Sequence, residues 1–478
     1  MGQTLRRSCA ACAKAKHSCD LRTPHCSRCV KRKVRCVYAN APSTVPSTAS
    51  TRAECQLLGR SPDNLGSFGD GRLASLDPFE SYPQTRLPRD RVQRLIHSFI
   101  HKIAFQYYPL DVNAASNPFL VSWWPLALGD PALFHVSLQT ACLDEELLAQ
   151  KGFEASEILM ADSVTLLRRK IENLSLAVQD GTMNSVITLA AIEFGKGNTE
   201  TSDMHVEGVK RLVHLRGGIN SVRQTSPLTA RMVAWVSMLV TGHPQFETQD
   251  DFGIGDGIPP THEWQMNSII SLQNNMADLH RVGVGPEVRN VYNRLRNAFH
   301  RAQRTPLPST QLHDLASFVI HRLLLTAPNP ASPAPSPITE CLRYAMVLFM
   351  FIVQGPTYFS HAVILNNIVA RFIENFTQLE WTLCVFDPLD VWFFGVGLAA
   401  SSGTAKYSWF VKRAQAIIAS LQLNSWDEVL EVMKSVLWLE TLRGESIFRR
   451  QWETVFNVAG GGGVVDTTSV VWDGMSLE

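Results

Sequence analysis

Six cysteines between residues 9 and 36 constrain this chain more than any other feature. They are Cys9, Cys12, Cys19, Cys26, Cys29 and Cys36, and the second three repeat the spacing of the first three. A Cys-x-x-Cys pair binds one metal from a tight turn, and a third thiolate about two helical turns later reaches the same ion. Each half therefore offers three ligands where tetrahedral zinc needs four, and sharing one cysteine from each half completes two sites. We expect six thiolates to hold two structural zinc ions.

Two other uses of these cysteines have less support. A disulfide framework belongs to secreted chains, and the N-terminus MGQTLRRSC contains no apolar signal segment. Zinc ribbons and ring-like zinc folds use other spacings or histidine ligands. His17 and His25 flank the cysteines, but six thiolates already suffice, so we expect both histidines to face solvent or phosphate.

The spacing resembles that of the fungal binuclear zinc cluster transcription factors. The resemblance extends to Pro24, between the halves, and to the basic segment that follows the second cysteine. It implies that Cys9 and Cys26 bridge the two ions, that Cys12 and Cys19 complete one site, and that Cys29 and Cys36 complete the other. It also implies a helix after Cys12 that enters the major groove and reads a CGG-like triplet, with Lys16 at the base-contacting position.

The chain departs from that family at three positions. Ala13, Ala15 and Ser18 stand where basic residues are common. Either affinity is lower, or Lys14, His17 and the second half compensate. Each missing cation at a phosphate also flattens the salt dependence of binding by roughly one unit of slope.

The positive charge is concentrated in the same segment. Residues 1–38 carry ten basic side chains and one acidic side chain, a balance of +9, whereas the rest of the chain is at −8. With two zinc ions and six thiolates the module stays near +7, and such a surface favours a polyanion such as duplex DNA. The side chains expected at phosphates are Arg6, Arg7, Lys14, Arg22, Lys31, Arg32 and Lys33. The run KRKVR at 31–35 also suits nuclear import.

Residues 39–88 are rich in Pro, Ser, Thr and Gly, which predicts a disordered linker. No sustained heptad follows the cysteines, so a coiled-coil dimer is not expected, and monomeric binding or dimerisation through the next domain stays open. The longest apolar run, Tyr344–Val353, suits a buried helix and is too short to span a bilayer. We therefore expect a soluble chain with no membrane partner.

From residue 89 to 456 the apolar residues follow the helical period. Val92, Leu95, Ile96, Phe99 and Ile103 share one face. Similar stripes recur at 130–149, 155–176, 182–195, 204–216, 228–241, 286–303, 310–326, 338–354, 359–377, 388–400, 407–421 and 426–442. They predict a large all-α domain, interrupted by a Pro-rich loop at 327–337.

One of these stripes is more specific. The segment from His205 to Ile219 predicts an amphipathic helix that ends at Gly217 and Gly218. The residues expected on its buried face are Val206, Val209, Leu212, Val213 and Leu215. This segment is similar to the hallmark helix of the fungal-specific transcription factor domain, and the looser resemblance spans most of 90–456. Residues 457–478 are expected to form a flexible acidic-apolar tail, either a frayed end or a short activation segment.

Signatures of catalysis are weak. The Asp250-Asp251 pair is the nearest candidate for magnesium binding, but glycines follow it and no further spaced carboxylates accompany it. The run GIGDG at 253–257 has neither the preceding strand nor the following helix of a phosphate loop. Zinc-protease, hydrolase and kinase motifs are absent from the sequence.

The chain is therefore predicted to be a nuclear, sequence-specific DNA-binding regulator of RNA polymerase II transcription, and not an enzyme. It would act with the transcription machinery or co-regulators, and by resemblance its targets include a biosynthetic gene cluster. The alternative is a zinc-cluster interaction protein or co-regulator that binds protein or RNA. A helical enzyme with a zinc appendage is a third class, which would show turnover in residues 89–456 alone.

Overall fold

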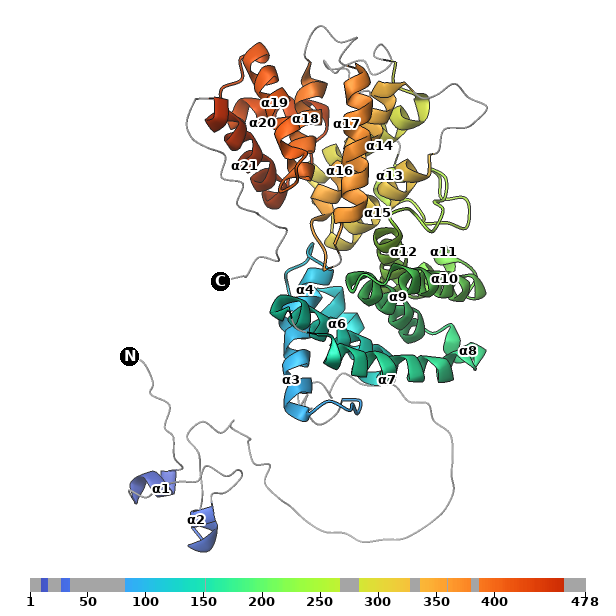
Figure 1. The fold of residues 1–478 in the computed structure, drawn as a ribbon, viewed down its shortest axis with the longest axis vertical. Coiled ribbons are helices and arrows are strands. Elements are labelled where there is room, and N and C mark those ends of the chain that lie inside the picture. The colour runs from blue at the N-terminus through green and yellow to red at the C-terminus, as the bar shows by residue number, and fades with distance from the viewer. Residues whose placement is uncertain are drawn as a thin grey trace, which may run out of the picture. The chain divides into compact units, whose positions relative to one another are not determined.

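The computed structural model describes residues 10–15, 27–34, 82–150, 152–266, 283–326, 336–358, 360–379 and 387–459. The chain divides into two compact units, Met1–Arg72 and Leu73–Glu478, and the described parts of both are helical (Figure 1). Within these ranges, β structure is limited to an isolated bridge between Thr248 and Ile258. This confirms the predicted class of a small N-terminal module followed by a large all-α domain.

The helix bounds fall into three groups. The first unit contains α1 (Ala10–Lys14) and α2 (Ser27–Lys31). The N-terminal half of the second unit contains α3 (Arg89–Ser98), the π-helical turn η1 (Phe99–Ile103), α4 (Ala104–Tyr107), the π-helical turn η2 (Phe119–Trp123), α5 (Trp124–Gly129), α6 (Pro131–Ala149), α7 (Glu154–Ile171), α8 (Leu174–Ala177), α9 (Asp180–Gly195), α10 (Thr199–Leu215), α11 (Ile219–Thr225) and α12 (Pro227–Thr241). Its C-terminal half contains α13 (His262–Gln265), α14 (Pro286–Arg304), α15 (Ser309–Leu325), α16 (Pro337–Gln354), α17 (Ala362–Leu379), α18 (Pro388–Ser401), α19 (Tyr407–Leu421), α20 (Trp426–Val436) and α21 (Leu442–Ala459).

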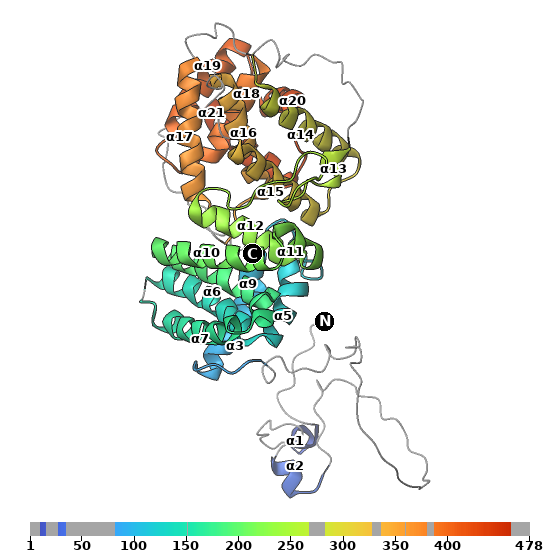
Figure 2. The ribbon, with the colours of Figure 1, turned by 90° about the vertical axis from the view of Figure 1, so that its right-hand side faces the viewer.

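Two buried helices organise the N-terminal half. Every residue of α9 from Gly181 to Glu193 is buried, and so is every residue of α6 from Ala132 to Leu143. A helix without a polar face must be covered on all sides. Figure 2 shows this arrangement, with α10, α9, α6 and α7 stacked as successive layers that contact one another. The stripe from Val92 to Ile103 packs into the same core, as its period predicts.

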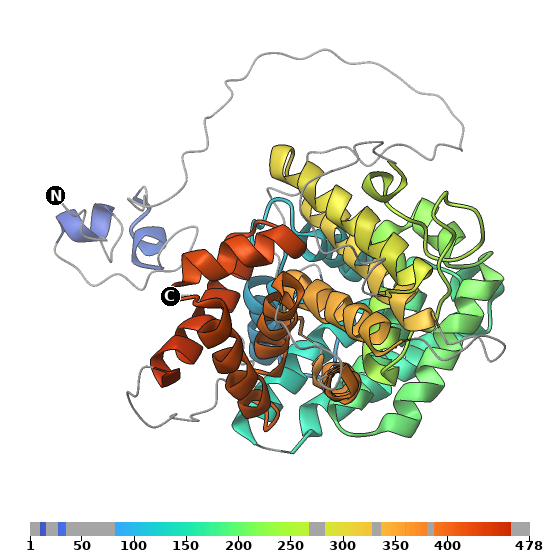
Figure 3. The same ribbon diagram turned by 90° about the horizontal axis from the view of Figure 1, so that it is seen from above.

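The C-terminal half is built in the same way around α16 and α18, seen from above in Figure 3. Leu389–Ser401 is buried throughout, and so is Ile338–Gln354 apart from Glu340. Proline at the first position starts both helices, and α18 adds a capping box between Asp387 and Asp390. In the described part of the chain, α16 alone is long and apolar enough to cross a membrane, and 89% of its residues are buried inside the fold, as in a core helix.

Tyr358 joins the two halves. Its backbone N–H donates to the Gln106 carbonyl at 2.7 Å, and its hydroxyl donates to the Thr140 carbonyl at 2.9 Å. The Tyr358 ring also stacks on Tyr107, with 5.3 Å between ring centroids. These contacts tie the connection after α16 to α4 and α6.

Two predicted helices end earlier than their stripes. The stripe at 155–176 is two helices, because Asn173 adopts an extended backbone and its side chain caps α8 by accepting from the Ser175 N–H at 3.0 Å. The stripe at 426–442 stops at Val436. There the carbonyls of Val436 and Leu437 accept from Tyr292 at 2.8 Å and from Trp392 at 2.7 Å, so tertiary hydrogen bonds replace helical ones. Helix α21 lies beyond every predicted stripe.

Candidate nucleic-acid interface

The first unit contains two equivalent helices. α1 begins at Ala10 and α2 begins at Ser27, so each starts one residue after the first cysteine of its half. The first helix was expected after Cys12, but α1 begins before Cys12 and includes it, and α2 likewise includes Cys29.

The buried residues of this unit are cysteines. Cys12 is 3% exposed and Cys29 is 2% exposed, and they are the buried side chains among the described residues of the unit. α1 and α2 contact each other. A pair of five-residue helices without an apolar core cannot fold by hydrophobic burial alone, and soft thiolate donors suit zinc. The cysteine-rich interior therefore fits a zinc-stabilised unit.

The outer surface of these helices is cationic. Lys14 on α1 and Arg28, Lys31, Arg32 and Lys33 on or next to α2 are exposed. Residues 10–15 and 27–34 contain no carboxylate, so none of these cations is neutralised by its neighbours in those segments. The surface matches the electrostatic character of a nucleic-acid-binding module. Cys9, Cys19, Cys26, Cys36, Arg6, Arg7, Lys16 and Arg22 lie outside the described residues.

The end of α2 is capped in a way that the sequence did not reveal. The Val34 N–H donates to the Cys29 carbonyl at 3.1 Å, and the Lys33 N–H donates to the Val30 carbonyl at 3.2 Å. These two bonds form a Schellman motif, which requires the left-handed backbone seen at Lys33, with φ of 52°. Glycine normally occupies that position, so the sequence carried no signal for the motif. The cap turns the chain at Lys33, beside the buried Cys29.

In the second unit, the segment predicted to be the hallmark helix forms α10. Val206, Val209, Leu212 and Val213 are buried as expected. Leu215, which was expected to be buried, is 57% exposed. It follows Val213 by two residues, which places it about 200° around the helix and on the opposite face. Gly217 and Gly218, both with positive φ, end the helix as predicted.

Arg216, between this helix and the glycines, connects three helices. Its guanidinium donates to the Val178 carbonyl at 3.3 Å, to the Thr225 hydroxyl at 2.6 Å and to the Ser226 hydroxyl at 3.0 Å, and it pairs with Asp180. Ser226 also donates to Asp180 at 2.6 Å. The arginine thus ties the end of α10 to the start of α9 and to the connection between α11 and α12. No pattern in the sequence singles out this residue.

The acidic pair considered as a magnesium site has structural partners. Asp250 accepts from the backbone N–H groups of Phe252 at 2.9 Å and Ile254 at 2.8 Å. Asp251 accepts from the Trp264 indole at 3.0 Å and from the Asn290 amide at 2.7 Å. Both carboxylates therefore shape the loop before α13 and hold it against α14.

Two family comparisons match this architecture. Residues 7–44 match the fungal Zn(2)-Cys(6) binuclear cluster domain, and residues 94–279 match the fungal specific transcription factor domain. The chain carries the two domains of a fungal zinc-cluster transcription factor. Its N-terminal domain accordingly binds two structural zinc ions. Both families are transcription-factor domains and not enzyme families.

The second match covers part of the helical unit of this zinc-cluster factor. It begins within α3 and ends at residue 279, so α14 and all later helices lie beyond it. The single regulatory domain expected over 89–456 therefore remains a prediction. No curated protein and no solved structure matches the chain.

Proposed function

We propose that this transcription factor reads a CGG-like triplet in duplex DNA through its N-terminal unit. The observation that carries the proposal is the set of exposed cations on α1 and α2 around a buried pair of cysteines, in segments without carboxylates. Such a surface neutralises phosphates and positions the protein on the duplex, while base contacts supply the specificity.

The zinc ligands in this proposal are Cys9, Cys12, Cys19, Cys26, Cys29 and Cys36, with Cys9 and Cys26 bridging the two ions. The equal placement of α1 and α2 relative to the first cysteine of each half supports this assignment. So does the burial of Cys12 and Cys29. In a tetrahedral thiolate site the metal supplies the folding free energy that an absent core cannot.

Lys16 is the residue proposed to contact bases. It follows Cys12 by four residues, as Lys33 follows Cys29, so the two lysines are equivalent in the duplicated spacing. Lys33 is exposed at the end of α2, and an equivalent position at the end of α1 would leave Lys16 accessible to a base edge. The phosphate contacts are assigned to Arg6, Arg7, Lys14, Arg22, Lys31, Arg32 and Lys33.

Selection from random duplex DNA by the zinc-loaded full chain tests this proposal. The wild type should enrich a CGG-like triplet. Lys16→Ala should lose discrimination worth about 1–3 kcal/mol at the triplet and keep salt-dependent binding, because a base contact specifies and phosphate contacts position. Cys19→Ala should lose both activities. Lys412→Ala, which removes an exposed lysine on α19, should change neither and serves as the control.

Phosphate binding has a separate signature. Removing Lys31 or Arg32 should weaken binding to every sequence and lower the slope of log affinity against log salt by about 0.9 for each phosphate that is no longer neutralised. A zinc-loaded wild type that enriches no duplex sequence would contradict the proposal.

A second candidate function has one observation in its favour. Val30 and Val34 are 60% and 48% exposed on the same cationic element, and exposed apolar side chains suit a protein partner. The unit would then be an interaction module that binds protein or RNA. Tighter binding to single strands than to duplex DNA, without sequence enrichment, would favour this candidate.

The cellular setting is part of the same proposal. The factor would act in the nucleus, on promoters of RNA polymerase II and together with co-regulators, and by resemblance its targets include a biosynthetic gene cluster. The run KRKVR at 31–35 supports nuclear import. Chromatin immunoprecipitation with sequencing would report the compartment, the promoter class and the target genes together. Signal spread evenly over the genome would contradict it.

A further inference from the structure

The outer face of α14 consists of hydrogen-bond donors. Figure 2 shows this helix at the edge of the C-terminal half, beside α13. Its apolar residues are buried, among them Val288, Leu295 and Phe299, and this burial fixes which face points outward. Every residue from Arg289 to Arg304 that is not buried is arginine, asparagine, glutamine or histidine. This outer face therefore carries no carboxylate and no apolar side chain.

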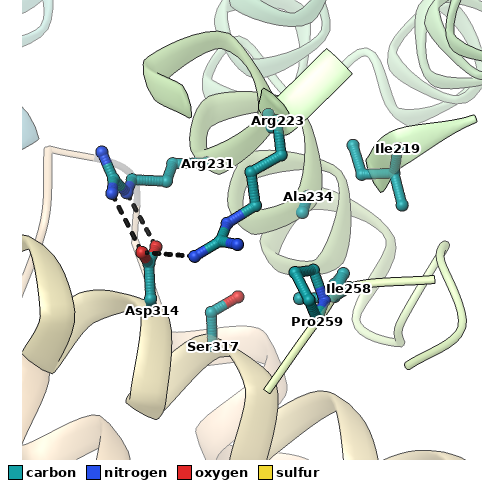
Figure 4. A pocket seen from close by; sticks show the side chains of 9 residues that line it. Ile219, Arg223, Arg231, Ala234, Ile258, Pro259, Asp314 and Ser317 are labelled. Atoms are coloured by element: carbon teal, nitrogen blue, oxygen red, sulfur yellow. Dashed lines mark hydrogen bonds and ion pairs between the residues drawn. The ribbon is translucent and has the colours of Figure 1, made fainter. Parts of the chain in front are cut away.

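Other arginines of the helical unit are paired with carboxylates. In the small pocket between α12 and α15, Arg231 binds Asp314 through Nε at 2.7 Å and Nη2 at 2.9 Å, and Arg223 reaches the same carboxylate at 3.1 Å (Figure 4). On α14 itself, the largely buried Arg294 pairs with Asp251, with 3.4 Å between Nε and Oδ2. Such pairing compensates a guanidinium that the fold partly removes from water.

Three arginines on the outer face of α14 have no such partner. Within the part of the chain that the structure describes, Arg289, Arg296 and Arg304 form no ion pair and no side-chain hydrogen bond. With about 3.6 residues per turn, they lie together with Asn293 and His300 in a sector of about 80° around the helix axis. A rise of about 1.5 Å per residue makes this row about 22 Å long. We call these five residues the α14 row.

The chemistry of the α14 row fits the phosphate backbone of duplex DNA. Residues 39–478 have a net charge of −8, so the row is a local exception on an acidic unit. A duplex carries one negative charge per about 1.7 Å of its axis, so phosphates are available along the whole row. Arginine and asparagine side chains are common donors to phosphate oxygens. An acidic peptide that docks through bulky apolar side chains finds no apolar surface on this face.

We infer that the α14 row is a second phosphate-binding surface, which contacts the backbone of the same duplex outside the triplet. The choice of duplex DNA as the partner rests on the proposed function. Two surfaces on one chain support each other, because binding of the first raises the local concentration of DNA at the second. Helix α14 lies beyond residues 94–279, so the family match assigns no role to this surface.

Binding of the zinc-loaded full chain to a duplex several helical turns long, with the triplet at its centre, tests the inference. Fluorescence anisotropy over a series of salt concentrations gives the slope of log affinity against log salt. The combined variant Arg289→Gln, Arg296→Gln and Arg304→Gln should lower this slope by about 0.9 for each phosphate that is no longer neutralised. Selection of the triplet should be unchanged, because the row contacts phosphates and not bases.

The matched control combines Arg168→Gln and Arg169→Gln on α7 with Arg211→Gln on α10, which removes the same charge at exposed positions elsewhere. Its slope should equal that of the wild type. If the combined α14 variant fails to fold, Arg304→Gln alone, at the last residue of the helix, should still lower the slope by about 0.9.

Equal slopes for the wild type and the α14 variant would overturn the inference, and so would an equal loss of slope in the control. Either result leaves triplet selection, and with it the proposed function, intact. Conversely, a wild type that selects no triplet but loses slope in the α14 variant would contradict the proposed function and support the α14 contact. Polyglutamate that binds more tightly than the duplex, and loses affinity in the α14 variant, would assign the row to an acidic protein and overturn the inference.

Discussion

His361 illustrates how single residues are held neutral in this core. It is 8% exposed and lies between Trp235 and Phe351, at centroid distances of 5.8 and 5.3 Å. Its Nε2 lies 3.0 Å from the Thr357 hydroxyl. Burial lowers the pKa of His361 to about 3, and burial likewise lowers the pKa values of His313 and His321 to about 4. All three imidazoles are therefore neutral in the folded protein at neutral pH.

These histidines predict acid sensitivity. The pKa values of these histidines in the folded protein lie below the unfolded value of about 6.5. Their contribution to the free energy of unfolding is therefore complete above pH 6.5 and disappears as the pH falls toward 4. Each histidine should lower the free energy of unfolding by roughly 2 kcal/mol between pH 7 and pH 5. Asp390 changes the stability in the opposite direction as the pH falls, because burial raises the pKa of its carboxyl group to about 6.

The measurement is urea unfolding of the full chain at pH 7 and pH 5, followed by tryptophan fluorescence. His361→Phe keeps the ring and removes the titration, so its loss of stability between the two pH values should be roughly 2 kcal/mol smaller than that of the wild type. Replacing the exposed His243 should leave the difference unchanged. An unchanged difference in His361→Phe would show that His361 is not the titrating group.

At the scale of helices, the connection after α10 holds the N-terminal half together. The chain leaves α10 through Gly217 and Gly218, whose N–H groups return to His214 at 3.0 Å and Val213 at 2.9 Å. Arg216 then bonds to the start of α9 and to the connection between α11 and α12. The hallmark segment is thus an amphipathic helix whose C-terminal end also connects neighbouring helices.

Arg216→Ala should therefore destabilise the helical unit by about 2–4 kcal/mol, because it leaves Asp180 partly buried without its cation and removes several charge-assisted hydrogen bonds. The stability of Arg216→Lys should lie between those of the wild type and Arg216→Ala, because a lysine ammonium keeps the positive charge but cannot form the paired hydrogen bonds of a guanidinium. Arg211→Ala, at an exposed position of the same helix, should stay within about 0.5 kcal/mol of the wild type. Urea midpoints measure all three. Equal midpoints for Arg216→Ala and Arg211→Ala would show that Arg216 does not stabilise the connection between these helices.

At the scale of the whole molecule, the two units are stabilised by different forces. The helical unit has a continuous apolar core that includes α6, α9, α16 and α18. The described part of the N-terminal unit buries two cysteines. Hydrophobic burial therefore stabilises the large unit, whereas metal binding supplies the folding free energy of the small one, about 10–16 kcal/mol in small zinc modules.

Zinc chelation should consequently unfold the small unit and leave the large one intact. Amide hydrogen exchange on the full chain after chelation should show reduced protection in α1 and α2, with protection in α9 and α16 unchanged. Zinc addition should restore the protection. Protection of α2 that survives complete chelation would show that the small unit does not need the metal.

The extent to which the sequence predicted the structure differs between the units. Helical periodicity located most helices of the large domain to within a few residues, and the cysteine spacing alone indicated the zinc unit. The ends of the helices were harder to predict from the sequence. Leu437 and Asn173 interrupt stripes that continue in sequence, because tertiary hydrogen bonds and a side-chain cap compete with the helical backbone there.

The sequence by itself determined the chemistry of this protein, since six regularly spaced thiols and a local excess of cations are properties of neighbouring residues. Only the tertiary structure decided that Arg216 connects neighbouring helices and that Arg223, Arg231 and Asp314 meet in one pocket. Arg231 and Asp314 are 83 residues apart in the chain. Local sequence patterns carry no information about this contact, because the packing of α12 against α15 creates it.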